Sequence, residues 1–455
     1  MKVSNQTLLH PSAQPTKRPS QLGVAENAPI RDPPACDDVI CHDLPAATAA
    51  AAAVAADGDT PIPTVTTIHT LGDDLLLDIF LRLPSLPSLV RAALACRSFL
   101  AAVRSSPAFR RRFRALHPPP LVGFVFETDG RDLPSFSPVR RRSDADLAAA
   151  VRGADVFLTR LPYHEDAYPG WEIKDCHGGC LLLLNSETEQ IAAYNPLTRA
   201  LHLLPTPPNE ISKGRRGKFE RLNFFLLLSE ENPGSFRVIT LCHDKSRVRA
   251  VVYSSGAREW RILPWSEAAP AQPSGKKHWL NMGRRANGNL YWSHRKQAYM
   301  VVLDTTAMQF SFMALPDFLK GQSRIYKIGE TKDGKLCLVF TVGFTLFISV
   351  WRVDNDGVER WIIDDKFLLE EEILQATEGT RDDDDELELQ VWFVMDGIVY
   401  LSPLICGDTH SPCWFLSFCP ETRKLEKLCH RTFDNSHFPY IMEWSPSLVG
   451  TDLSP

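Results

Sequence analysis

Gly288-Asn289-Leu290-Tyr291-Trp292 opens a pattern that continues through Asp304-Thr305 and closes at Leu315-Pro316. A turn containing glycine leads into an apolar run, a polar loop follows, and a second run carrying aromatic side chains ends near Leu-Pro. Short apolar runs bounded by turn residues predict β-strands rather than helices.

The same pattern recurs along much of the chain, in residues 179–205, 251–264, 334–361 and 397–428. Its closing points lie 45 to 67 residues apart, at Pro205, Pro264, Pro316, Trp361 and Leu428. Strand-rich repeats of about 40–60 residues suit the four-stranded blades of a β-propeller. The sequence therefore predicts an all-β, propeller-like domain. Residues 121–161 could supply one more blade, and insertions in the longer repeats leave the number of blades open.

Turn dipeptides separate these runs and support the strand assignment. They are Asp129-Gly130, Ser255-Gly256, Asn287-Gly288, Asp333-Gly334, Asp356-Gly357 and Asp396-Gly397.

Residues 70–116 have the periodicity of helices instead. Apolar side chains there fall on one side of a first helix, at Leu75, Leu76, Ile79, Phe80 and Leu83. We expect Asp73 or Asp74 to cap its start and Pro84 to end it. Ser85 and Pro87 then open a second helix, and helical spacing continues to Leu116, before Pro118-Pro119-Pro120.

This helical stretch resembles the F-box, the module that docks on a Skp-family adaptor and through it on a cullin. The residues at matching positions are Leu71, Leu75, Ile79, Leu83, Pro84, Leu89, Leu94, Cys96 and Phe99. Gly72 stands where the F-box usually has proline, and Phe99 stands where it usually has tryptophan. Neither difference removes an apolar contact, so the resemblance implies that these nine residues bind the adaptor.

A second resemblance lies within the repeats. Residues 175–179 and 195–198 are similar to the first repeat of the F-box-associated, kelch-like propeller domains that are common in plants. Together the two resemblances imply an F-box protein of the plant type. The predicted fold class is α+β multidomain, with a disordered Pro/Ala-rich arm at 1–68, an all-α F-box module at 69–117 and an all-β propeller-like domain at 118–455.

Composition narrows the function further. A net charge of -5 and a pI of about 6.2 argue against general nucleic-acid binding. The most apolar window, residues 336–351, is too short for a membrane helix and predicts two buried strands around Gly343. Eleven scattered cysteines without a signal peptide suggest reduced thiols, so we expect a cytoplasmic or nuclear protein.

Candidate chemical motifs are weak. Cys176-His177-Gly178-Gly179-Cys180 lacks the second ligand pair that zinc needs, so we interpret it as a turn before a buried strand. The acidic run 382–386 lacks the spacing of a calcium loop. We therefore predict no metal, no cofactor and no catalytic residues.

The leading hypothesis is a substrate-recognition subunit of a Skp–cullin–F-box ubiquitin ligase, with the propeller binding an unknown target protein. One alternative is an adaptor-bound scaffold or regulator that has no ubiquitination target. Others are a propeller binding module whose F-box has degenerated, and an enzyme with perturbed carboxylates or histidines in a central channel. Most tryptophans fall in strand patterns, which favours a place in the blade core over one at a binding surface.

Overall fold

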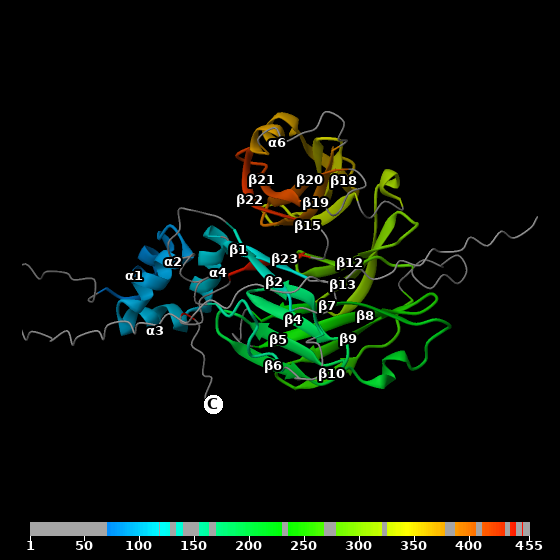
Figure 1. The fold of residues 1–455 in the computed structure, drawn as a ribbon, viewed down its shortest axis with the longest axis horizontal. Helices are drawn as coiled ribbons and strands as arrows, with labels where there is room; N and C mark the ends of the chain where they lie inside the picture. The colour runs from blue at the N-terminus through cyan, green and yellow to red at the C-terminus, as the bar shows by residue number, and fades with distance from the viewer. Residues whose placement is uncertain are drawn as a thin grey trace, which may run out of the picture. The chain divides into compact units, whose positions relative to one another are not determined.

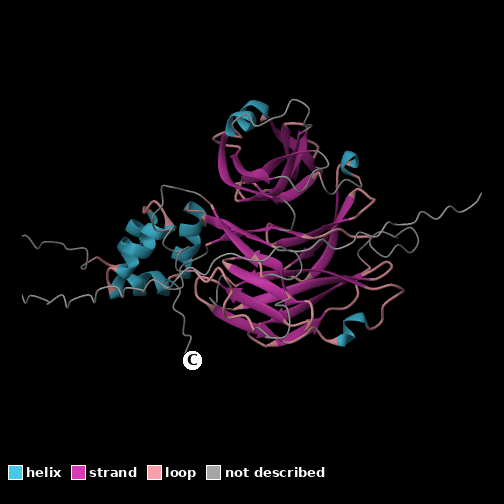
Figure 2. Ribbon diagram, in the orientation of Figure 1, coloured by secondary structure: helices cyan, strands magenta, loops and turns pink. Residues whose placement is uncertain are grey.

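The computed structural model describes residues 71–117, 119–127, 133–139, 154–162, 170–229, 235–267, 279–320, 325–377, 387–405, 412–432, 437–442 and 448. The predicted disordered arm, the acidic run 382–386, Asp129-Gly130 and Trp444 lie outside these residues. Figure 2 shows four helices at the start of the described chain and strands through most of the remainder.

The helical part contains four short helices, α1 (Asp73–Leu81), α2 (Leu86–Leu94), α3 (Arg97–Ser105) and α4 (Pro107–Leu116). Serine caps begin two of them, because Ser85 accepts from the Ser88 N–H (3.4 Å) and Ser106 from the Phe109 N–H (3.2 Å). The expected capping of α1 by an aspartate is wrong. Gly72 occupies the cap position, and Asp73 and Asp74 lie in the first turn, where negative charge offsets the helix dipole.

The strands form six antiparallel sheets (Figure 1). Five have four strands in chain order, and their bounds are β3 (Trp171–His177), β4 (Cys180–Asn185), β5 (Ile191–Asn195) and β6 (Ala200–Leu204); β7 (Glu220–Leu228), β8 (Phe236–His243), β9 (Val248–Ser254) and β10 (Glu259–Ile262); β11 (Arg284–Ala286), β12 (Asn289–Ser293), β13 (Tyr299–Asp304) and β14 (Gln309–Ala314); β15 (Tyr326–Glu330), β16 (Leu336–Val342), β17 (Thr345–Val353) and β18 (Glu359–Leu368); β19 (Leu387–Met395), β20 (Ile398–Ile405), β21 (Pro412–Cys419) and β22 (Lys424–Thr432).

The sixth sheet joins the two ends of the domain. Strand β1 (Leu121–Phe126) pairs on one side with β2 (Ser135–Pro138) and on the other with β23 (His437–Ile441), a strand more than 300 residues later. Each sheet contributes one strand that contacts its counterpart in a neighbouring sheet, as β3 contacts β7 and β15 contacts β19. The domain is a six-bladed β-propeller, and β1 and β2 with β23 make the extra blade that the sequence left open.

Short helices connect some strands, namely η2 (Asn209–Ser212), η3 (Asp317–Leu319) and α6 (Glu370–Ala376). None of the described helices is long and apolar enough to cross a membrane. The hydrophobic core of the propeller lies between neighbouring sheets. In one such layer Ile239 and Leu241 of β8 pack with Trp292 of β12 and Val301 of β13.

The hairpin turns explain why the repeat is visible in the sequence. In Asn287-Gly288 and in Gly178-Gly179 both residues have positive φ, as a two-residue hairpin turn requires. A second turn recurs between the last two strands of four blades, where the residue before the outer strand has φ between 52° and 59°. Those residues are Arg199, Arg258, Met308 and Arg423.

The predicted repeats match the observed sheets. Pro205, Pro264 and Pro316 each come within two residues of the end of an outer strand, after β6, β10 and β14. Trp361 and Leu428 lie inside the outer strands β18 and β22 instead. The apolar window 336–351 forms β16 and most of β17, with Gly343 at positive φ in the turn, so the prediction of two strands is confirmed.

Candidate functional sites

The residues of the predicted adaptor-binding set separate into exposed and buried positions. Leu75 and Ile79, one turn apart on α1, have exposed fractions of 59% and 42%, and Leu94 at the end of α2 has 52%. Leu76 and Phe80, the neighbours of Leu75 and Ile79, are buried instead. The apolar stripe of α1 therefore has an inner and an outer part, and large aliphatic side chains occupy the outer part.

The remaining six residues of that set lie in several environments. Leu71, Leu83 and Cys96 are half-buried and Pro84 is exposed. Leu89 and Phe99 are buried, and the Phe99 ring meets Phe80 edge-on at 5.6 Å. Leu89 and Phe99 therefore contribute to the core of the helical module, where they hold its helices in place.

A large cavity runs through the propeller and has a volume of about 1190 Å³. Residues of all six strands β3, β7, β11, β15, β19 and β23 line it, so it is the central channel. Its lining is strongly polar. Cations project from β3, β7, β11 and β15. Carboxylates or histidines occur on β3, β7, β15 and β23, and Asp396 follows β19.

Three of the channel carboxylates are already engaged. Asp175 of β3 accepts from the Arg285 guanidinium (2.5 Å) and from the Leu226 N–H (2.7 Å), which links β3, β7 and β11. Glu220 pairs with His243 at 3.0 Å. Glu330 accepts from the backbone N–H of Asn287. The contacts of Asp175 and Glu330 connect neighbouring blades, whereas Glu220 and His243 lie opposite each other within one blade.

Three basic groups in the channel influence one another's ionisation. Burial and the charge of Arg284 lower the pKa of Lys327 to about 7. Burial, together with Arg284 and Lys327, lowers the pKa of His437 to about 3. Solvent in the channel reaches Arg284, yet protein surrounds its side chain, and burial lowers the pKa of its guanidinium too. The centre of the propeller therefore gathers basic side chains whose charged forms burial disfavours.

The sequence suggested that an enzyme would show perturbed carboxylates or histidines in this channel. Perturbed groups are present, since burial and Glu330 raise the pKa of Asp396 while the pKa of His437 is lowered. A nucleophile is less evident, because burial raises the pKa of the Cys176 thiol well above its ordinary value. No group of three or more metal-ligating side chains is found in the described part of the chain.

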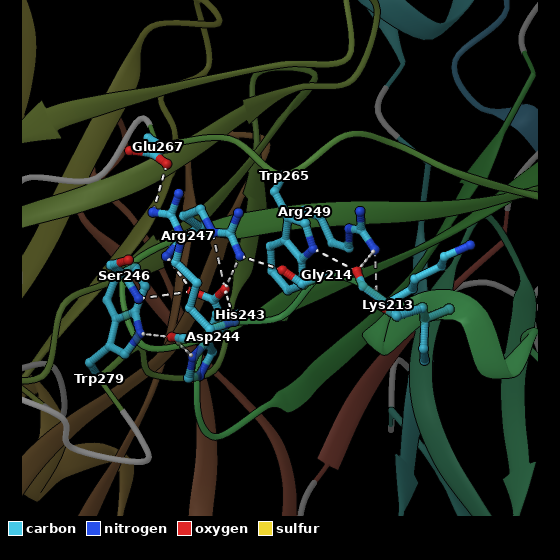
Figure 3. A network of polar contacts seen from close by, with 12 residues as sticks. Lys213, Gly214, His243, Asp244, Ser246, Arg247, Arg249, Trp265, Glu267 and Trp279 are labelled. Atoms are coloured by element: carbon cyan, nitrogen blue, oxygen red, sulfur yellow. Dashed lines mark hydrogen bonds and ion pairs between the residues drawn. The ribbon is translucent and has the colours of Figure 1, made fainter.

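Figure 3 shows a second polar site, at the β8–β9 turn. Here the segment Lys213–Lys218, which we call the basic loop, exposes the side chains of Lys213, Arg215, Arg216 and Lys218. Side chains of the propeller hold its backbone. The Lys213 carbonyl accepts from Trp265 Nε1 (3.0 Å) and from Arg249 (3.3 Å), and the Gly214 carbonyl accepts from Arg247 (2.7 Å).

Asp244 is the centre of this network. Its buried carboxylate accepts from the backbone N–H groups of Arg216, Ser246 and Arg247 and from the Arg247 guanidinium. Burial alone would raise the pKa of Asp244, but these hydrogen bonds outweigh it and the pKa is lowered. The Arg249 guanidinium also lies over the Trp265 ring at 4.3 Å. The basic loop therefore presents its cations on a fixed backbone.

The other motifs have structural roles. Cys176 and His177 end β3, Gly178 and Gly179 form the hairpin turn, and Cys180 begins β4, so the interpretation as a turn is confirmed. Among the described residues four tryptophans are buried, Trp171, Trp279, Trp292 and Trp392, and five are half-buried, Trp260, Trp265, Trp351, Trp361 and Trp414.

Sequence reasoning missed the channel residues Arg284, Lys327 and His437. Each lies in a short strand or at its end, where a single polar residue does not indicate a binding site. Their common feature is that they belong to inner strands, and only the arrangement of the blades brings those strands together. The basic loop was visible as a run of cations at 213–218 but had no assigned role.

A family model of known proteins agrees with this fold. A model of the family described as "F-box protein AT5G49610-like, beta-propeller" matches residues 172–448. No curated protein matches the chain. Matching solved structures include a Lactobacillus plantarum protein (10% identity, 69% of this chain and 83% of that one, TM-score 0.33) and TolB from Acinetobacter baumannii (11%, 77% and 72%, 0.33). Another is the allergen Mala s 1 of Malassezia sympodialis (12%, 56% and 77%, 0.28).

These structural similarities are too low to support a functional argument. The family model, in contrast, covers more than half of the chain, and its range contains four complete blades, all but the first residue of a fifth, and β23. The protein belongs to the family of F-box protein AT5G49610-like β-propellers.

Proposed function

We propose that this protein is the substrate-recognition subunit of a Skp–cullin–F-box ubiquitin ligase. In this role the helices α1 to α4 form the F-box and dock on a Skp-family adaptor, while the propeller binds the target protein. The protein performs no bond chemistry itself. It holds the target near the ubiquitin-transferring enzyme and so raises the local concentration of the target.

The observation that carries this proposal is the exposed pair Leu75 and Ile79 on α1. Both occupy positions of the F-box motif, and both are large aliphatic side chains that the module's own core leaves in solvent. Covering such a side chain contributes roughly 1.5–3 kcal/mol. The description of the matching family as F-box proteins supports the same role.

The test is co-purification of the full chain with a Skp-family adaptor, comparing wild type with Ile79→Asp. A charge placed in an apolar interface should weaken adaptor binding by about tenfold or more. Leu116→Asp is the matched control, because Leu116 is an equally exposed aliphatic residue (56%) of the helical module outside the predicted set.

Helicity of all three proteins, measured by circular dichroism, separates loss of contact from loss of fold. Binding that survives Ile79→Asp, or that Leu116→Asp weakens as much, would remove α1 from the adaptor interface. A folded wild-type protein that binds no adaptor would refute the proposal as a whole.

A further inference from the structure

The central channel is lined by basic side chains that the proposed adaptor interface does not use. Arg284 comes from β11, Lys327 from β15 and His437 from β23, three of the six strands that line the cavity. We propose that this channel binds a small organic phosphate, with Arg284 and Lys327 contacting the phosphate group.

The first argument concerns Arg284. Its guanidinium makes no hydrogen bond or ion pair with any described residue, although solvent reaches it inside the channel. The nearest source of negative charge is Asp175, whose carboxylate is already bonded to Arg285 and to the Leu226 N–H. A guanidinium that lines the cavity, is open to solvent and has no carboxylate bonded to it among the described residues is placed to bind an external anion.

The second argument is the mutual repulsion of the basic groups. Arg284 acts on Lys327, and Arg284 and Lys327 both act on His437, so the three lie within electrostatic range of one another. Within a low-dielectric cavity this repulsion is stronger than in water. An anion bound between Arg284 and Lys327 would replace repulsion by attraction, and two cations match the two charges of a phosphate monoester.

The third argument is the size and lining of the cavity. A volume of about 1190 Å³ lies at the upper end of the range typical of small-molecule sites and far exceeds a phosphate ion. Apolar and aromatic side chains also face it, among them Phe225, Met282 and Trp392. These surfaces suit an organic group attached to the phosphate.

Isothermal titration calorimetry of the full chain with inorganic pyrophosphate tests the proposal. Wild type should bind, and Arg284→Gln and Lys327→Met should each weaken binding by about tenfold or more. Lys335→Met is the matched control. Lys335 follows the same inner strand but is exposed at the β15–β16 turn, where it pairs with Asp333, so its loss should leave binding unchanged.

Proton uptake provides a second readout. At about pH 8 Lys327 is largely neutral, and a bound anion should raise its pKa and draw in a proton. Other titratable and charged groups face the channel near Lys327. Glu330 lies on the same strand as Lys327, β15. The neighbouring strands supply Arg284 and Arg285 of β11, Asp396 after β19, and His437 of β23. The binding heat of wild type should therefore vary with the ionisation enthalpy of the buffer, and that of Lys327→Met should vary much less.

Three results would overturn the proposal. The first is that wild type fails to bind pyrophosphate at millimolar concentration. The second is that both channel variants bind it as tightly as wild type does. The third is that Lys335→Met loses as much affinity as the channel variants, which would place the ligand on the outer surface. Urea unfolding of each variant confirms that it is folded. None of these results depends on adaptor binding.

Discussion

Asp244 shows how one buried carboxylate positions the backbone of an exposed loop. Its buried carboxylate has two oxygens with different partners. Oδ1 accepts from the backbone N–H groups of Ser246 and Arg247, and Oδ2 accepts from the Arg216 N–H (2.9 Å) and the Arg247 guanidinium (2.6 Å). Asp244 therefore binds the basic loop directly at Arg216 and also positions Arg247, which donates to the Gly214 carbonyl of that loop.

We expect Asp244→Asn to lower the free energy of unfolding by about 2–4 kcal/mol. Asparagine can replace Oδ1 as an acceptor, but its NH₂ group would face the Arg216 N–H and the Arg247 guanidinium, which are all donors. Urea unfolding measures the change. Asp304→Asn is the control, because Asp304 makes the same turn contacts to Thr306 and Ala307 in an exposed position, so its substitution should cost less than about 0.5 kcal/mol.

The pH dependence has a definite sign. Since the folded-state pKa of Asp244 is lowered, its stabilisation is present above the unfolded pKa of about 3.9 and is lost as pH falls through the folded value. The difference in stability between wild type and Asp244→Asn should therefore narrow below about pH 4. A difference that stays constant down to acid unfolding would contradict the ionic role of Asp244.

At the scale of elements, the inner strands approach one another closely. A side chain at Gly329 of β15 would place its Cβ 2.4 Å from Val394 Cβ and 2.7 Å from the Val394 carbonyl oxygen on β19. The glycine therefore lets the inner strands of two neighbouring blades pack in contact. The clash with the Val394 carbonyl oxygen could not be relieved by a side-chain rotation, because that oxygen belongs to the backbone.

Gly329→Ala should destabilise the propeller by about 2 kcal/mol or more, because overpacking forces the two strands apart. A thermal or urea unfolding curve gives the value. Gly256→Ala is the matched control, since Gly256 is exposed, lacks a positive φ and has its nearest neighbour, Ser254 Oγ, 3.9 Å away. Equal effects of the two substitutions would show that the approach of β15 to β19 is not tight.

At the scale of the whole molecule, the propeller closes through a single late strand. Strand β23 pairs with β1 and also contacts β3, and the Tyr440 hydroxyl donates to the Gly179 carbonyl (3.1 Å) in the β3–β4 turn. It also supplies His437 and Phe438 to the channel wall. Without β23 the ring of blades would be open between the first sheet and the second.

Removal of residues 437–455 should therefore lower the urea midpoint of the propeller strongly and expose β1 as an edge strand that aggregates. Removal of residues 449–455 alone is the control and should leave the midpoint nearly unchanged. If both truncations unfold at the wild-type midpoint, β23 does not close the propeller.

The sequence by itself determined the elements, since these follow from local chemistry. Turn pairs such as Asn287-Gly288 require positive φ, Pro84 cannot continue a helix, and alternating apolar runs mark strands. The sequence also indicated residues 121–161 as a source of one further blade. It did not separate the exposed Leu75 and Ile79 from the buried Leu76 and Phe80, because a broad apolar stripe does not show which part its own core covers.

Tertiary structure decided which elements meet. The pairing of β1 with β23 joins residues more than 300 positions apart, and no local signal specifies such a partner. The channel has the same origin, because Arg284, Lys327 and His437 lie on separate strands and line one cavity only when six blades close a ring. Local propensity acts over a few residues, whereas a binding site depends on the packing of surfaces that the sequence keeps apart.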